Sequence, residues 1–144
     1  MITNERQFRI AKAQMEKFKF SITNFDMESL VKSGTDRLIA QAQLDQLQSE
    51  HEILLEQIKE YEHLSSGEQK EFEMQSLQDL PIALIKARIA RNWTQKQLAE
   101  IVGVKEQQIQ RYEAEMYQSA NLATLARVAE VLCLTMPDHA VVNF

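Results

Sequence analysis

The stretch WTQKQLAEIVGVKEQQIQRYE, from Trp93 to Glu113, predicts two short helices joined by a tight turn. Thr94 is suited to cap the first helix, and Gln97, three residues later, completes a capping box. Gly103 follows this helix at the point where the chain needs a residue that tolerates a positive φ. The spacing of these signals therefore predicts where the first helix begins and where it ends.

The second helix of the pair is expected to have an apolar and a polar face. Val104, Ile109 and Tyr112 recur at helical spacing and predict the apolar face. Two helices joined by a turn of about three or four residues cross steeply, so the contact position on the first helix must be small, as Ala99 is. An ordinary antiparallel helical hairpin is the alternative, but it would not require both Ala99 and Gly103. The outward-facing residues are expected to be Glu106, Gln107, Gln110 and Arg111.

Residues 80–134 resemble the Cro/cI-type, or xenobiotic-response-element, helix-turn-helix family through TQKQLAEIVGV followed by IQRYE. The resemblance implies a lambda-repressor-like domain of five helices, whose second paired helix enters the DNA major groove and whose dimers read two half-sites. It also implies that Gln95 contacts phosphate and braces the first base contact. Lys105 stands where such proteins usually have a Ser or Thr cap and is a candidate for a phosphate contact. The expected DNA-binding residues are Thr94, Gln95, Lys96, Lys105, Glu106, Gln107, Gln110 and Arg111.

The outward-facing residues suit direct recognition of bases. Glutamine pairs with the N6 and N7 atoms of adenine, arginine with the O6 and N7 atoms of guanine, and glutamate accepts from the N4 amine of cytosine. Arg111 is the strongest single candidate for a base contact.

Charge is distributed unevenly along the 144 residues, whose formal net charge is −5. From Asp79 onward, seven Lys and Arg balance seven Asp and Glu, so residues 1–78 carry the whole deficit. Basic residues, among them Arg88, concentrate between Lys86 and Arg111, where phosphate contacts are expected. An acidic N-terminal part cannot lie on DNA and is free for another partner.

The N-terminal part predicts an antiparallel helical hairpin. Phe8, Ala11 and Met15 begin a heptad repeat that continues to Phe25, and a second repeat runs through a helix expected over 35–64. The residues between, 26–34, are expected to form a connection or a frayed helix end. The aromatic stripe is large, so part of it is expected to contact the C-terminal domain or a second subunit.

The fold class expected is mainly α, with three regions. Residues 1–66 form the acidic helical hairpin for dimerisation or partner binding, 67–79 a linker with room for a short strand, and 80–144 the DNA-binding domain. Segments 70–75 and 140–144 have strand character and could pair as a small two-stranded β element. A helix opening at Leu80-Pro81 is expected to end at Asn92, and Ser119 is expected to cap a later helix.

Several classes of protein are disfavoured. No run reaches the length of a membrane span and no signal peptide is evident, so a cytoplasmic protein, associated with the nucleoid when bound to DNA, is expected. The lone Cys133 is expected to be a small core residue. Glu60 and His63 have a spacing used by di-iron bundles, but only one such motif is present. We expect no catalytic residues, no cofactor and no metal site, and hence no enzyme.

Three functional hypotheses remain. The leading one is a sequence-specific transcriptional regulator, a repressor that binds an inverted-repeat operator in double-stranded DNA as a homodimer. A narrower version, implied by the resemblance, is an antitoxin of the host-inhibition-of-growth class, whose acidic hairpin would bind a basic toxin protein. The alternative from another class is a helical protein–protein adaptor that does not bind DNA.

Overall fold

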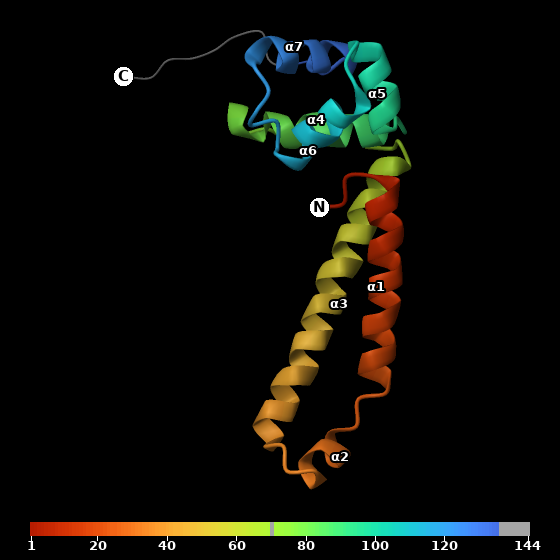
Figure 1. Cartoon of the computed structure of the whole chain (residues 1–144), viewed down its shortest axis with the longest axis vertical. Helices are drawn as coiled ribbons and strands as arrows, with labels where there is room; N and C mark the ends of the chain where they lie inside the picture. The colour runs from red at the N-terminus through yellow and green to blue at the C-terminus, as the bar shows by residue number, and fades with distance from the viewer. Residues whose placement is uncertain (70, 136–144) are drawn as a thin grey trace, which may run out of the picture. The chain divides into compact units, whose positions relative to one another are not determined.

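The computed structural model describes residues 1–69 and 71–135 of the chain, and over these residues the regular structure is helical (Figure 1). The chain divides into two compact units, Met1–Glu62 and His63–Phe144. In the described residues, no helix is both long enough and apolar enough to cross a membrane. The mainly α fold class is confirmed.

The first unit is an antiparallel hairpin of α1 (Glu5–Thr23) and α3 (Arg37–Ser65), the latter continuing into the second unit (Figure 1). Asn4 caps α1 by accepting a 2.9 Å hydrogen bond from the Gln7 amide. The rings of Phe8 and Tyr61 stack with their centroids 4.8 Å apart. Because these rings come from the beginning of α1 and the end of α3, their contact fixes the register of the two helices.

The connection between these helices contains a further short helix, α2 (Met27–Lys32), where the sequence favoured a loop or a frayed end. Asp26 caps it by accepting from the Ser29 amide at 3.0 Å. Gly34 follows with a φ of 101°. A local capping signal therefore starts a helix that the heptad pattern does not include.

The second unit contains a 3-10 turn, η1 (Leu77–Asp79), and the helices α4 (Leu80–Ala90), α5 (Gln95–Val102), α6 (Glu106–Ala114) and α7 (Leu122–Val131). The resemblance implies a domain of five helices. In this part of the chain, the described residues form four α-helices and the turn η1. Side chains from all four pack into one core, and its largest fully buried members include Leu84, Ile85, Leu98, Ile109, Val128 and Leu132. As predicted, α4 begins at Leu80, and Asn92 follows it with a φ of 55°.

Three local expectations need correction. Asn121, and not Ser119, caps α7, because the Ser119 hydroxyl donates to Glu115 while the Asn121 side chain accepts from the Thr124 amide. Residues 71–75 form no strand, and their proposed partner, 140–144, lies outside the described residues.

Cys133 is exposed and is not a core residue. It occupies the left-handed position that ends α7, with a φ of 49°. The Leu134 amide donates to the Ala129 carbonyl and the Cys133 amide to the Glu130 carbonyl, each at 2.9 Å. This is a Schellman motif, and it turns the cysteine side chain outward while the neighbouring Leu132 stays buried.

Candidate functional site

The helix pair α5 and α6 forms as its local signals predict. Thr94 Oγ1 accepts from the Gln97 amide at 3.1 Å, and Gln97 Oε1 accepts from the Thr94 amide at 2.8 Å, which completes the capping box. Gly103 ends α5 with a φ of 84°. Ala99 is 1% exposed, in keeping with its role as the small contact position between the two helices.

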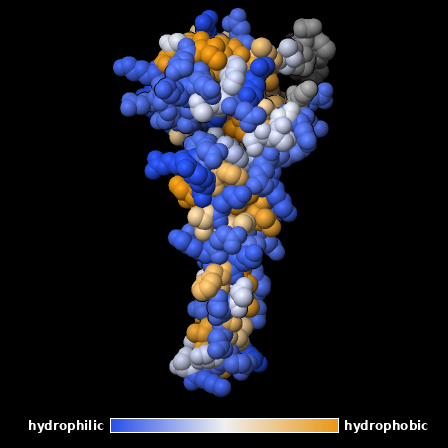
Figure 2. Space-filling model, turned by 90° about the vertical axis from the view of Figure 1, so that its right-hand side faces the viewer, coloured by the Kyte–Doolittle hydropathy of each residue, from blue (hydrophilic) through white to orange (hydrophobic). Residues whose placement is uncertain are grey.

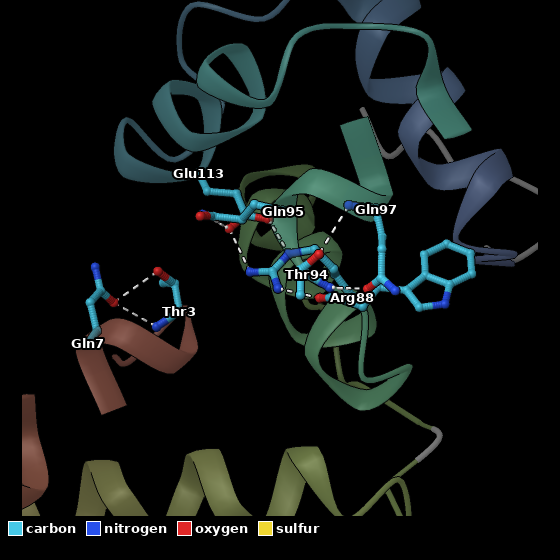
Figure 3. A network of polar contacts seen from close by, with 8 residues as sticks. Thr3, Gln7, Arg88, Thr94, Gln95, Gln97 and Glu113 are labelled. Atoms are coloured by element: carbon cyan, nitrogen blue, oxygen red, sulfur yellow. Dashed lines mark hydrogen bonds and ion pairs between the residues drawn. The ribbon is translucent and has the colours of Figure 1, made fainter. Parts of the chain in front are cut away.

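A buried polar network holds α4, α5 and α6 together (Figure 3). From α4, Arg88 donates to both carboxylate oxygens of Glu113 in α6, at 2.6 and 2.7 Å. A third Arg88 nitrogen donates to the Trp93 carbonyl at 2.8 Å, just before α5 begins. From α5, Gln95 Nε2 donates to Glu113 Oε2 at 2.8 Å. One arginine therefore links three consecutive elements.

The arginine and the glutamate of this network are almost fully removed from solvent, with 2% of Arg88 and 1% of Glu113 exposed. Desolvation of two charges is costly, and it is offset only where the geometry is good and the other polar atoms are satisfied. The paired hydrogen bonds and the two additional partners meet that condition. The network therefore fixes the orientation of α6 relative to α4 and α5.

The outward face of α6 carries Glu106, Gln107, Gln110 and Arg111, all of them exposed. Spacings of one, three and four residues place them on one side of the helix, opposite the buried Ile109 and Tyr112. Gln110 Nε2 donates to Glu106 Oε1 at 2.9 Å, so these two side chains lie side by side. The Arg111 guanidinium lies 5.8 Å from the ring centroid of Tyr112. The hydrogen-bonding groups on this face belong to a helix that the core holds in place.

The structure brings the remaining predicted residues together around the same two helices. Lys96, in the first turn of α5, is exposed, and Lys105 is exposed at the start of α6. Lys105 makes no capping hydrogen bond through its side chain. The Thr94 side chain takes part in the capping box. The side-chain amide of Gln95 points toward Glu113, and its NH2 group donates to that carboxylate inside the domain.

Sequence reasoning missed the roles of Arg88 and Glu113. Arg88 was grouped with the basic residues expected near phosphate, and that grouping is wrong because its guanidinium is buried and donates to Glu113 and Trp93. A signal was present in α4, whose sequence LPIALIKARIA places Arg88 at helical spacing with the buried Leu84 and Ile85. A charged residue on an otherwise apolar face indicates a buried partner, although its identity follows only from the fold.

Tyr117 is a further buried polar residue, 2% exposed, and its ring stacks on Tyr112 with centroids 5.8 Å apart. Its hydroxyl has no hydrogen-bond partner among the described residues. Burial and the nearby Glu113 carboxylate raise the pKa of this phenol well above its ordinary value, and Arg88 opposes the shift only in part. The phenol therefore stays neutral at physiological pH.

Comparison with protein families gives a match over part of the chain. Residues 84–136 match a protein family described as helix-turn-helix. That segment runs from α4 through α7 and contains the whole buried network and the outward face of α6. The comparisons with curated proteins and with solved structures found no match.

Proposed function

Because residues 84–136 form a Cro/cI-type helix-turn-helix domain, the domain of a DNA-binding transcription regulator, we propose that this protein is a sequence-specific repressor. It binds an inverted-repeat operator in double-stranded DNA as a homodimer. The outward face of α6 enters the major groove and α5 crosses the phosphate backbone.

The observation that carries this proposal is the exposed face of α6 on a rigidly held helix. Glu106, Gln107, Gln110 and Arg111 are exposed, while Ile109 on the opposite side is completely buried. Glutamine and arginine side chains at adjacent positions supply the donors and acceptors that distinguish base pairs. Lys96 and Lys105 are exposed at the starts of α5 and α6, which supports a role for both in phosphate contacts.

The proposal is tested by titrating the protein against DNA from upstream of its own coding region. We expect a shifted complex at low salt whose affinity falls steeply as salt rises, because phosphate binding releases counterions. A random duplex of equal length serves as the competitor. No shift at low salt would reject DNA binding and favour the protein–protein adaptor.

Two substitutions separate base reading from phosphate binding. Arg111→Ala should cost about 1 to 3 kcal/mol at one base position and relax the preference there, whereas Lys96→Ala should weaken binding to all sequences alike. Binding is measured on the operator and on a set of single-base variants. Equal losses on every sequence for Arg111→Ala would contradict a base contact by this residue.

A narrower function is that of an antitoxin, and the charge of the N-terminal part favours it. Residues 1–78 carry the entire net charge of −5. Such a surface would attract a basic partner protein through electrostatic complementarity. The test is co-expression with the product of the neighbouring reading frame, followed by purification of the complex. Absence of a small basic neighbour that co-purifies would favour a free-standing regulator.

A further inference from the structure

The hairpin of α1 and α3 has only a small buried core, formed by Ile2, Ala11 and Ile58, with Phe8, Met15, Leu54 and Tyr61 packed against it. Among its apolar residues, Ile2, Ala11, Ala40 and Ile58 are buried, whereas Phe18 and other large residues of the seam remain partly exposed. Figure 1 shows the two helices diverging toward α2. A helix with an apolar stripe must bury it against another element, so this hairpin needs a further layer.

The two sides of the hairpin can be told apart by helical geometry. Each residue turns an α-helix by about 100°, so residues on either flank of the seam fall on opposite sides of the hairpin. The contact of Lys12 Nζ with Glu62 Oε1, at 3.2 Å, identifies one side. We name this side the charged face, because α1 and α3 also place Glu16, Lys19, Glu52 and Lys59 on that flank.

The opposite flank is the neutral face. In α1 it comprises positions 7, 10, 14, 17 and 21. In α3 it comprises positions 39, 43, 46, 50, 53 and 57. Its charged residues are Lys17 and Glu50, and its remaining polar residues are Ser21 and glutamines.

Three isoleucines give the neutral face its apolar surface. Ile10 is 59% exposed, Ile39 56% and Ile53 50%. Phe8 and Tyr61 stack, so they lie at the same height along the hairpin. Counted from this pair, Ile10 and Ile53 are offset by roughly six residues along the helix axes, which corresponds to about 9 Å. Hydrophobic residues reach the surface of the hairpin in Figure 2. Exposed isoleucines among uncharged residues are typical of the core of a protein interface, where charged residues are depleted.

We infer that the neutral face is covered by the neutral face of a second copy of this chain, so that two hairpins form a four-helix bundle. Its charge carries this choice of partner. The neutral face has no electrostatic potential complementary to a strongly charged partner such as DNA or a basic protein. In a two-fold interface, Lys17 of one copy can instead meet Glu50 of the other, because each copy presents the same patch.

The dimensions of the face suit a stable dimer. The 19 residues of α1 span about 28 Å, and two packed helices are about 20 Å wide. Such a face is of the order of the 800 Å² that each partner buries in a standard interface. The inference deepens the proposed function, since it names the surface that would bring two reading helices together on an inverted repeat.

The test is the mass of the full chain in solution, measured without DNA by sedimentation equilibrium. We expect twice the mass of one chain for the natural protein. Ile53→Glu should raise the dissociation constant of the dimer by about 100-fold or more, because each dimer would bury two carboxylates. Leu38→Glu is the matched control, since Leu38 is 78% exposed and lies on α3 away from the seam. Circular dichroism verifies that each variant is helical.

A charge exchange keeps the test independent of folding, because Lys17 and Glu50 are both exposed. Lys17→Glu should weaken the dimer, and adding Glu50→Lys should restore it. The inference would be overturned if the natural protein were monomeric at tens of micromolar. It would also be overturned if neither Ile53→Glu nor Lys17→Glu changed the dissociation constant of the dimer. A protein that is monomeric alone and uses these isoleucines to bind a different protein would overturn it as well.

DNA binding separates this inference from the proposed function. A monomeric Ile53→Glu variant should keep its affinity for a single half-site and lose affinity for the paired operator. If no variant binds DNA while the natural protein is a dimer sensitive to Ile53→Glu, the regulator proposal fails and the interface stands. If DNA binds and the mass does not respond to these substitutions, the interface fails and the regulator proposal stands.

Discussion

The guanidinium of Arg88 and the carboxylate of Glu113 meet in two hydrogen bonds, of 2.6 and 2.7 Å, inside the helix-turn-helix domain. The two residues are 25 positions apart in the chain and are 2% and 1% exposed. Their pairing ties the last turn of α6 to α4, so the orientation of α6 depends on a buried ion pair.

Arg88→Met should lower the free energy of unfolding by about 3 to 5 kcal/mol, because it leaves the Glu113 carboxylate buried without its counterion. Urea denaturation followed by circular dichroism measures the loss. The control is the double variant Arg88→Met with Glu113→Leu, which removes both charges and should recover much of the stability. A single variant as stable as the natural protein would show that the pair is dispensable.

Gly103→Ala should destabilise the domain by about 1 to 2 kcal/mol, the cost of a left-handed conformation for a residue with a Cβ. The φ of Gly103 is 84°, and no atom lies within 4 Å of the place a Cβ would take, so the cost is conformational and not steric. Gly103→Asn should cost less, since asparagine tolerates this region. Thermal unfolding of the two variants compares them, and equal losses would point to another cause.

Lys105→Ser should separate stability from DNA affinity. Lys105 precedes α6 without a capping hydrogen bond, so serine should add about 0.5 to 2 kcal/mol to the stability. If Lys105 binds phosphate, the same change should weaken DNA binding and reduce the slope of affinity against salt by about one charge. Lys105→Ala is the control, because it should show the same loss of DNA affinity without the added stability of a capping side chain. An undiminished salt slope in both variants would exclude the phosphate contact.

Tyr117→Phe should leave the protein as stable or stabilise it by about 1 kcal/mol at neutral pH, because it removes a buried hydroxyl without a hydrogen-bond partner. The folded state raises the pKa of this phenol above its ordinary value of 10.0. Titration of this phenol therefore leaves the stability unchanged below pH 10 and lowers it as the pH rises further. Urea titrations from pH 8 upward should show a shallower alkaline loss in the variant, and parallel losses would contradict the assignment.

The chain's own sequence was sufficient to predict the helix pair, because the signals that define it are local. Thr94, Gln97 and Gly103 act on backbone groups within one helical turn, and their hydrogen bonds and positive φ are found where the sequence predicts them. The exposed face of α6 followed equally from helical spacing, since residues four apart share a side wherever the helix lies. Local capping and periodicity do not depend on the rest of the fold.

Tertiary structure alone decided which polar residues are buried and which apolar residues are not. Arg88 reads as one of several surface cations until α4 and α6 are packed together, and Cys133 reads as a core residue until the Schellman motif turns it outward. The neutral face likewise exists only once the register of α1 against α3 is known. The helical spacing in α4 gives a signal that Arg88 is buried, but pairing is a property of residues brought together from distant positions, and no local pattern in the chain specifies the partner.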